Sequence, residues 1–113
     1  MREPSLERAV MEVLWAEGRA LTPAGVRERL HPDHSVAYTT VMTVLTRLWR
    51  KKMATRRREG RAFAYRPTEN REAFTARRME EILGSSGDRS LALSRFLENL
   101  SGEEREHLRE MLE

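Results

Sequence analysis

The sequence contains no cysteine. Disulfide bonds, thiolate metal sites, cysteine nucleophiles and thiol redox sensing are therefore excluded. It also has no apolar run approaching the ~20 residues of a membrane span, and its N-terminus carries no apolar signal-peptide segment. We therefore expect a cytoplasmic protein without membrane insertion.

Catalytic and metal-binding patterns are missing as well. The sequence has no nucleophile–base–orienter set, phosphate-binding loop or zincin motif, so we predict no enzyme. His31 and His34 flank Pro32-Asp33, and His107 stands in a polar segment, a spacing that matches no zinc pattern. We expect neither a metal site nor a cofactor, and interpret these histidines as surface residues.

Positive charge, in contrast, is concentrated in one part of the chain. Residues 35–66 contain nine Lys/Arg against a single acid, Glu59, for a net charge of +8. The 34 residues before this block carry −1 and the 47 after it carry −4, so the total is only +3. Such focusing is typical of a surface that binds a polyanion, and duplex DNA is the expected partner.

Three helices are predicted in the first half of the chain, at residues 6–16, 23–30 and 37–52. Ser5 is the expected N-cap of the first, and Thr22 with Pro23 begins the second. Between them Leu21 forms a short strand or turn. Apolar residues recur at helical spacing, which predicts a shared core. The core-facing residues are Leu6, Val10, Val13, Leu14, Val26, Leu30, Val41, Val44, Leu45 and Leu48.

The outward face of the third helix has hydroxyl side chains near its N-terminus and arginines near its C-terminus. Hydroxyls beside the free N–H groups of a helix N-terminus suit close approach to phosphates and base edges. We therefore predict that this face contacts DNA, with a solvated amphipathic helix as the alternative. The predicted contact residues are Tyr38, Thr39, Thr40, Met42, Thr43, Thr46, Arg47 and Arg50.

A β-hairpin follows, with strands at residues 53–58 and 61–66 around Glu59-Gly60, where glycine supplies a positive φ. Phe63 and Tyr65 share a face of the second strand and can cover the helical core. Arginines gather at the tip, either to contact DNA or only to protect the strand edge. The predicted DNA contacts of the hairpin are Arg57, Arg58 and Arg61. Three helices and a basic hairpin follow the winged helix-turn-helix order.

Beyond residue 67 the sequence predicts three more helices. Thr68 is the expected cap of the first. Residues 84–88 are loop residues that end this helix, and Ser101 with Glu104 forms a capping box for the last. Their apolar residues have little to bury against, so we expect them to pair two copies, with folding back on the first domain as the alternative. The predicted dimerisation residues are Leu83, Leu91, Leu93, Phe96, Leu97, Leu100, Leu108, Met111 and Leu112.

The predicted fold class is therefore mainly α with a small β-wing. Residues 1–67 are expected to form a winged helix-turn-helix DNA-binding domain, and residues 68–113 a C-terminal helical dimerisation region.

Three motifs point to one family. They are A-Y-T-T-V-M-T-V-L-T-R-L-W-R-K-K followed by E-G-R-A-F-A-Y-R-P, L-E-R-A-V-M-E-V-L-W near the start, and the tail from Ser90. Together they resemble the recognition helix and wing, the first helix and the dimerisation segment of the BlaI/MecI penicillinase repressors. The resemblance implies a homodimeric repressor that binds palindromic operators. It places DNA contacts at Thr39, Thr40, Met42, Thr43, Arg47, Arg58 and Arg61.

The chain departs from the family pattern in three places. Met53 stands where relatives usually have glycine after the K-K pair, so the helix-to-strand turn is expected to differ. The C-terminal cysteines of the copper-sensing branch are absent, which excludes that mode of induction. In the β-lactam branch a membrane-sensor pathway cleaves an Asn-Phe bond, so the resemblance implies an indirect link to a membrane sensor and protease. At the comparable position of this chain Phe96 follows Arg95, so the Asn-Phe pair is absent there.

Two classes of function remain after these observations. The first is a DNA-binding transcriptional repressor that acts as a homodimer. The alternative is a winged-helix module for protein–protein assembly, whose basic face meets an acidic partner.

Overall fold

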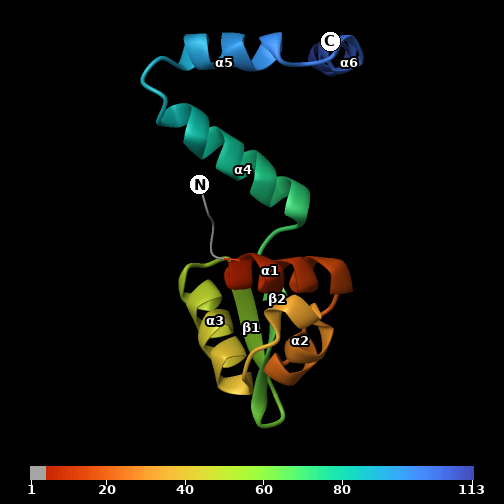
Figure 1. The fold of residues 1–113 in the computed structure, drawn as a ribbon, viewed down its shortest axis with the longest axis vertical. Coiled ribbons are helices and arrows are strands. Elements are labelled where there is room, and N and C mark those ends of the chain that lie inside the picture. Colours follow the sequence, from red (N-terminus) through yellow and green to blue (C-terminus); the bar gives the residue numbers. More distant parts are fainter. Residues whose placement is uncertain (1–4) are drawn as a thin grey trace. The chain divides into compact units, whose positions relative to one another are not determined.

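A computed structural model describes residues 5–113, with side chains from Leu6 onward. Within that range the chain forms six α-helices, one 3-10 helix and a two-stranded antiparallel sheet (Figure 1). The elements are α1 (Ser5–Glu17), α2 (Pro23–Arg29), η1 (Pro32–His34), α3 (Tyr38–Arg50), β1 (Ala54–Glu59), β2 (Ala62–Pro67), α4 (Arg71–Gly84), α5 (Arg89–Glu98) and α6 (Gly102–Leu112). The predicted class, mainly α with a small β-wing, is confirmed.

The elements fall into two compact units, Met1–Ala73 and Phe74–Glu113. The first unit holds α1, α2, α3, the hairpin and the first turn of α4. The second holds the rest of α4 with α5 and α6. No helix in the described part of the chain is long and apolar enough to cross a membrane. The division into functional domains at residue 67 stays a prediction.

The core of the first unit lies where its three helices meet the hairpin. Eight of the ten predicted core residues are buried, and Leu6 and Val13 are half-buried against them. The stripe of α1 is wider than predicted, because Met11 is also buried, at 3% exposure. The buried cluster consists of Val10, Met11, Leu14, Leu21, Val26, Leu30, Val41, Val44, Leu45, Leu48, Ala54 and Tyr65.

Local signals at the start of α2 behave as predicted. The Thr22 hydroxyl accepts a hydrogen bond from the Gly25 N–H at 3.2 Å, and Pro23 occupies the first helical turn. Leu21 pairs with Tyr65 of β2 through two backbone hydrogen bonds of 2.8 and 2.7 Å. The segment between α1 and α2 is thereby fixed to the hairpin. The capping role predicted for the Ser5 side chain lies outside the described residues, and α1 itself includes Ser5.

α3 ends two residues earlier than predicted. The Lys52 N–H donates to the Trp49 carbonyl (3.0 Å) and the Met53 N–H donates to the Leu48 carbonyl (2.9 Å), the bond pattern of a Schellman C-cap. Lys52 has a φ of 65°, a left-handed conformation that favours glycine. The strained position of this helix end is therefore Lys52, one residue before Met53.

Both strands of the hairpin lie one residue later in the chain than predicted. The strands begin at Ala54 and Ala62, because the N–H of Met53 closes the end of α3 and is not available to a strand ladder. Glu59 pairs with Ala62, so the two-residue turn is Gly60-Arg61 and not Glu59-Gly60. Gly60 has a φ of 65°, which explains why glycine stands at the turn.

The predicted cap of α4 is wrong. Asn70 caps this helix by accepting from the Ala73 N–H at 2.8 Å, whereas the Thr68 hydroxyl donates to the Lys52 carbonyl at 2.8 Å. The predicted capping box of α6 is confirmed. The Glu104 N–H donates to the Ser101 hydroxyl at 3.1 Å, and the Glu104 carboxylate accepts from the Ser101 N–H at 2.9 Å.

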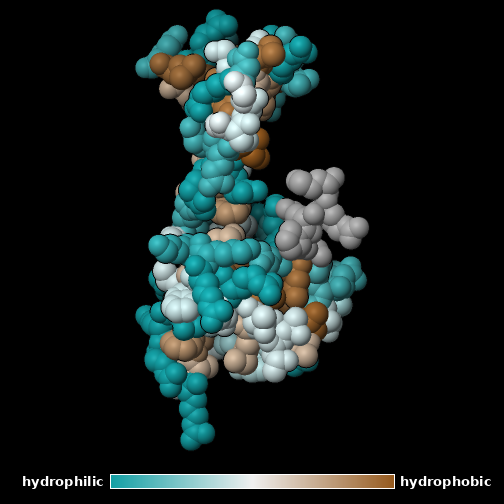
Figure 2. Space-filling model, turned by 90° about the vertical axis from the view of Figure 1, so that its left-hand side faces the viewer, coloured by the Kyte–Doolittle hydropathy of each residue, from teal (hydrophilic) through white to brown (hydrophobic). Residues whose placement is uncertain are grey.

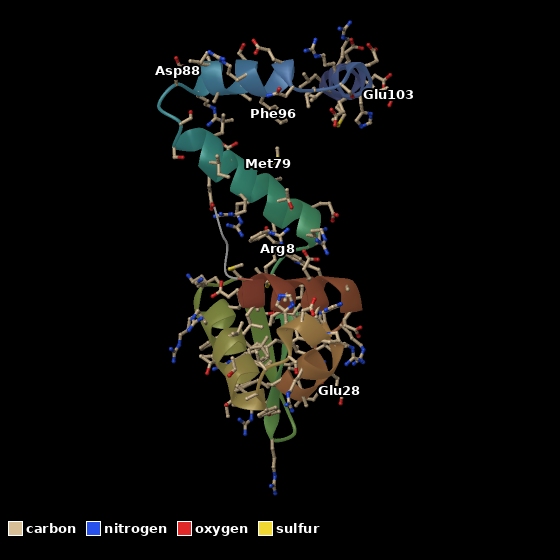
Figure 3. All side chains as sticks on the ribbon, in the orientation of Figure 1. Arg8, Glu28, Met79, Asp88, Phe96 and Glu103 are labelled. Carbon is tan, nitrogen blue, oxygen red and sulfur yellow. The ribbon has the colours of Figure 1, made fainter. Side chains whose placement is uncertain are left out.

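No residue described in α4, α5 or α6 is buried. Phe74, Leu83, Leu100 and Leu108 are half-buried, and the remaining large apolar side chains are exposed. Figure 2 shows some of them as brown patches in its upper part, and Met79 and Phe96 are labelled in Figure 3. The exposed set is Met79, Ile82, Leu91, Leu93, Phe96, Leu97, Met111 and Leu112.

Candidate nucleic-acid interface

The face of α3 opposite the buried Val41, Val44, Leu45 and Leu48 is open to solvent. Of the eleven predicted DNA contacts on α3 and the hairpin, ten are exposed and Thr46 is half-buried. Six of them line one shallow depression along the helix, which the edge of a ligand could enter. These six are Thr39, Met42, Thr43, Thr46, Arg47 and Arg50.

The N-terminal end of α3 has unused hydrogen-bond donors. Its N-cap, Ala37, makes no side-chain capping bond; the Thr40 N–H donates to the Ala37 carbonyl at 3.1 Å, whereas the N–H groups of Tyr38 and Thr39 have no acceptor within the helix. Thr43 donates its hydroxyl hydrogen to the Thr39 carbonyl at 3.0 Å, and its hydroxyl oxygen can still accept. This end of the helix therefore offers both donors and acceptors to a neighbouring polar molecule.

The C-terminal end of α3 is tied to α1 by an acid that sequence reasoning missed. Both Glu7 carboxylate oxygens lie 3.2 Å from the Lys51 ammonium, and one lies 3.7 Å from the Arg47 guanidinium. The ends of the two helices are adjacent in Figure 1. Glu7 and Lys51 stand 44 residues apart, so no local pattern could have indicated this pair.

Arg56 was also missed as a structural residue. Its guanidinium stacks between Trp49 and Phe63, 3.5 and 4.0 Å from the two ring centroids, and donates to the Tyr65 hydroxyl at 3.3 Å. Cations stack favourably on aromatic faces. Arg56 thus joins the end of α3 to the hairpin, and Trp49 packs against it without being part of the core.

The other hairpin arginines stay exposed. Arg58 shares the face of Arg56 and lies 5.3 Å from the Phe63 ring, while Arg57 points to the opposite face, 3.9 Å from Glu59. Arg61 is in the turn itself. The N-terminal end of α3 and this turn lie at the same end of the unit (Figure 1). A single extended polyanion could therefore contact both.

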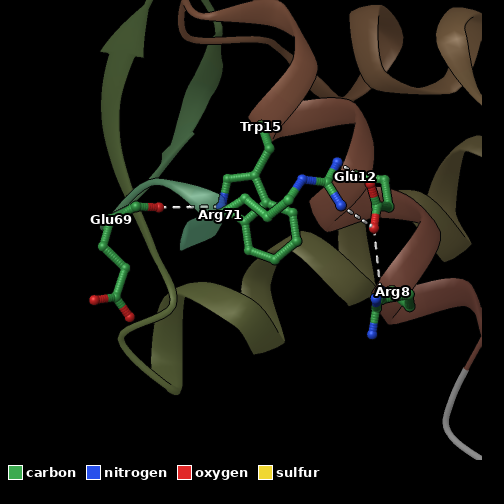
Figure 4. A network of polar contacts seen from close by, with 5 residues as sticks. All are labelled: Arg8, Glu12, Trp15, Glu69 and Arg71. Atoms are coloured by element: carbon green, nitrogen blue, oxygen red, sulfur yellow. Dashed lines mark hydrogen bonds and ion pairs between the residues drawn. The ribbon is translucent and has the colours of Figure 1, made fainter. Parts of the chain in front are cut away.

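A second polar network lies away from this face, where α1 meets the start of α4 (Figure 4). The Arg71 guanidinium contacts both oxygens of the Glu12 carboxylate, one of them at 2.7 Å, and Arg8 donates to the same group at 3.1 Å. The hydrogen bonds from Arg71 hold the pKa of Glu12 below its ordinary value, and Glu12 raises the pKa of Arg71. The Trp15 indole donates to the Glu69 carbonyl at 3.1 Å.

The histidines form no cluster with other ligands. Within the described residues no three His, Asp or Glu side chains are grouped as metal ligands would be. His31 and His107 are exposed and His34 is half-buried. The His31 Nδ1 accepts from the Asp33 N–H at 3.1 Å and so caps η1.

The first unit packs three helices against an arginine-tipped hairpin, and its third helix exposes a threonine-and-arginine face. This combination defines a winged-helix DNA-binding protein. The chain belongs to the penicillinase repressor family, whose model matches residues 4–113. It is 40% identical over 110 residues to the transcriptional regulator BlaI of Mycobacterium tuberculosis, covering 95% of this chain and 80% of that protein.

Solved structures agree on the fold. A MarR family protein from Bacillus stearothermophilus aligns with a TM-score of 0.50 at 22% identity, over 98% of this chain and 70% of that one. The PcaV transcriptional regulator of Streptomyces coelicolor aligns with a TM-score of 0.51 at 24% identity, over 97% and 72%. At these identities the likeness concerns the fold alone.

Proposed function

We propose that this protein is a transcriptional repressor that binds operator DNA as a homodimer. The recognition surface, defined here as the exposed face of α3 together with the hairpin turn, enters the major groove with α3 and follows the backbone with the turn. The observation that carries this proposal is the placement of the threonine-and-arginine face opposite the core stripe of α3. That face lies outside the buried core and is available to a ligand.

The charge distribution supports the same assignment. The block with a net charge of +8 spans α3 and the whole hairpin. Only Glu59 in this block is acidic, and it lies beside Arg57 at the base of the turn. Arginine and lysine at phosphates supply affinity that falls steeply with salt. Threonine, methionine and arginine on the helix face supply contacts to base edges and methyl groups.

The exposed side chains of α4, α5 and α6 support the dimer. Eight large apolar residues there remain exposed in the single chain, and burying such surface is a common driving force for association. A twofold dimer presents two recognition surfaces, so its operator is an inverted repeat with half-sites separated by about one helical turn, ~34 Å.

The test is selection of bound fragments from genomic DNA, followed by titration of the selected duplex and a scrambled one. We expect an inverted repeat to be enriched, and the selected duplex to bind at least ~10³-fold more tightly than the scrambled one. Equal binding to both duplexes at every salt concentration would contradict operator recognition and favour the alternative, a basic surface that meets an acidic protein.

Two pairs of variants divide the surface by role. Arg58→Ala and Arg61→Ala should weaken binding to all duplexes alike, and each should reduce the salt slope by about one unit. Thr40→Ala and Thr43→Ala should instead reduce discrimination between operator and random DNA, by about 1–3 kcal/mol for each direct interaction with a base that the substitution removes. A sequence-selective decrease in the hairpin variants would show that the turn contacts bases.

A further inference from the structure

Glu7 holds two cations at the edge of the recognition surface. It lies in the first turn of α1, and its side chain is only 15% exposed, although its partners Lys51 and Arg47 are about half-exposed at 50% and 54%. Its two oxygens contact the Lys51 ammonium equally, at 3.2 Å. The carboxylate is thus a fixed anion, and the two cations converge on it.

This arrangement matches the chemistry of a phosphate subsite. Arg47 and Lys51 are four residues apart and therefore lie on one side of the helix end. A DNA phosphate presents anionic oxygens to the same kinds of donor that contact Glu7. Arg50, in contrast, makes no ion pair with any residue that the structure describes, so it is available to DNA without a competitor.

We propose that Arg47 and Lys51 form a subsite for a DNA backbone phosphate, and that Glu7 occupies this subsite in the free protein as a competing anion. The inference rests on the proposed function and adds Lys51 to the recognition surface. On binding, the phosphate takes the two cations from Glu7, and the carboxylate remains as a like charge close to the phosphate.

Glu7 therefore lowers the affinity for DNA, and it does so equally for every DNA sequence. The two cations are each about half-exposed, and solvent weakens ion pairs to such exposed groups, so a phosphate can displace the carboxylate. Because phosphate contacts carry no base information, Glu7 lowers the affinity for every duplex and leaves the preference for the operator unchanged. Its role is to limit non-specific binding, to which the +8 block contributes strongly.

The experiment compares Glu7→Gln with a matched control, Glu17→Gln, in the full-length chain. Glu17 is also on α1 and also pairs with an arginine, Arg29 at 3.1 Å, but it makes no ion pair with α3 among the described residues. Both substitutions remove one negative charge. Binding is measured by fluorescence anisotropy with a labelled random-sequence duplex at a series of salt concentrations, and thermal melting confirms that each variant is folded.

We expect Glu7→Gln to bind more tightly than the wild type and to steepen the salt slope by about one unit, because the surface then presents one more net positive charge to the DNA. A slope steeper by one unit makes the gain about 3.5-fold larger at 50 mM than at 200 mM salt. Glu17→Gln should have the wild-type slope. Adding Lys51→Ala to Glu7→Gln should remove most of the gain, because the cations account for it.

Equal slopes for Glu7→Gln and Glu17→Gln, or weaker binding by Glu7→Gln, would overturn the proposal. If Glu7→Gln does not fold, comparing Lys51→Ala with Arg50→Ala tests the proposal instead. Lys51 is already paired with Glu7 in the free protein, so its removal should reduce the salt slope less than removal of Arg50 does. An equal reduction contradicts the inference. A wild type that binds no duplex refutes the proposed function itself, which separates the two failures.

Discussion

The two units of this protein differ in what their apolar residues do. In Met1–Ala73 twelve apolar and aromatic residues form one buried cluster, whereas in Phe74–Glu113 no described residue is buried. A helix gains most of its stability in proteins from packing its apolar face. The first unit therefore carries its own source of stability, and the second is expected to obtain it from a second copy of the chain.

The difference also separates two kinds of sequence signal. Apolar residues at helical spacing occur in both units, yet among the described residues only those of the first unit are buried within the single chain. Periodicity predicts which face of a helix is apolar, but not whether that face is covered by the same chain or by another. Four predictions test this contrast, from the largest expected effect to the smallest.

The first prediction addresses the second unit. Phe96→Asp places a charge in the exposed apolar surface of α5, so we expect the dimer to dissociate and operator affinity to fall by about 10²–10⁴ because the two halves are no longer tethered. Sedimentation and operator titration measure both effects. Ser94→Asp, an exposed polar position on the same helix, should leave both unchanged. A Phe96→Asp protein that remains dimeric would contradict the expectation that the second unit is stabilised by a second copy of the chain.

The second prediction addresses the core of the first unit. Leu45 is fully buried, so Leu45→Ala should lower the free energy of unfolding by about 2–5 kcal/mol. Denaturant titration gives the value. Met42→Ala, on the exposed face of the same helix at 41% exposure, should change it by less than about 0.5 kcal/mol. Similar decreases at both positions would mean that the exposed face of α3 is needed for folding.

The third prediction tests the end of α3. Lys52 has a φ of 65°, so Lys52→Gly should stabilise the first unit by about 0.5–1 kcal/mol by relieving the left-handed strain. The neighbouring Lys51 has a φ of −78°, and Lys51→Gly removes the same charge without this relief. A higher melting temperature is expected for Lys52→Gly only. A gain for both variants would assign the effect to charge.

The fourth prediction concerns pH. The pKa of Glu12 is lowered in the folded protein by its hydrogen bonds from Arg71, so this pair stabilises the fold above the ordinary carboxyl pKa of 4.5. The contribution disappears as the pH falls through the lower folded pKa. Since the Glu12 side chain is 35% exposed, we expect less than about 1 kcal/mol. Glu12→Gln should flatten the stability profile below pH 4.5, and an unchanged profile would contradict the assignment.

The sequence predicted best those features that depend on neighbours along the chain. The inward stripe of α3, Thr22 as the cap of α2 and the box of Ser101 with Glu104 are each defined within one or two helical turns. Such patterns are set by helical geometry and by hydrogen bonds between residues close in sequence.

The features that were missed depend on competition or on distant contacts. Thr68 and Asn70 are both good caps, and the choice between them was made by the Lys52 carbonyl, which accepts the Thr68 hydroxyl. The one-residue shift of the hairpin came from the C-cap of α3, in which the Met53 N–H donates to the Leu48 carbonyl. Glu7 on Lys51 and the stack of Arg56 join separate elements, so spacing along the chain contains no signal for them.

The stack of Arg56 on Trp49 has an optical consequence. The emission of an indole depends on its immediate surroundings, and Trp49 is covered on one face by the guanidinium of Arg56 and is 38% exposed. Trp15, the other indole, is hydrogen-bonded to Glu69 and lies 5.1 Å from Arg71. A Trp15→Phe protein would therefore carry a single native tryptophan fluorophore at the joint between α3 and the hairpin. Its spectrum would report movement of the hairpin against α3 without any attached dye.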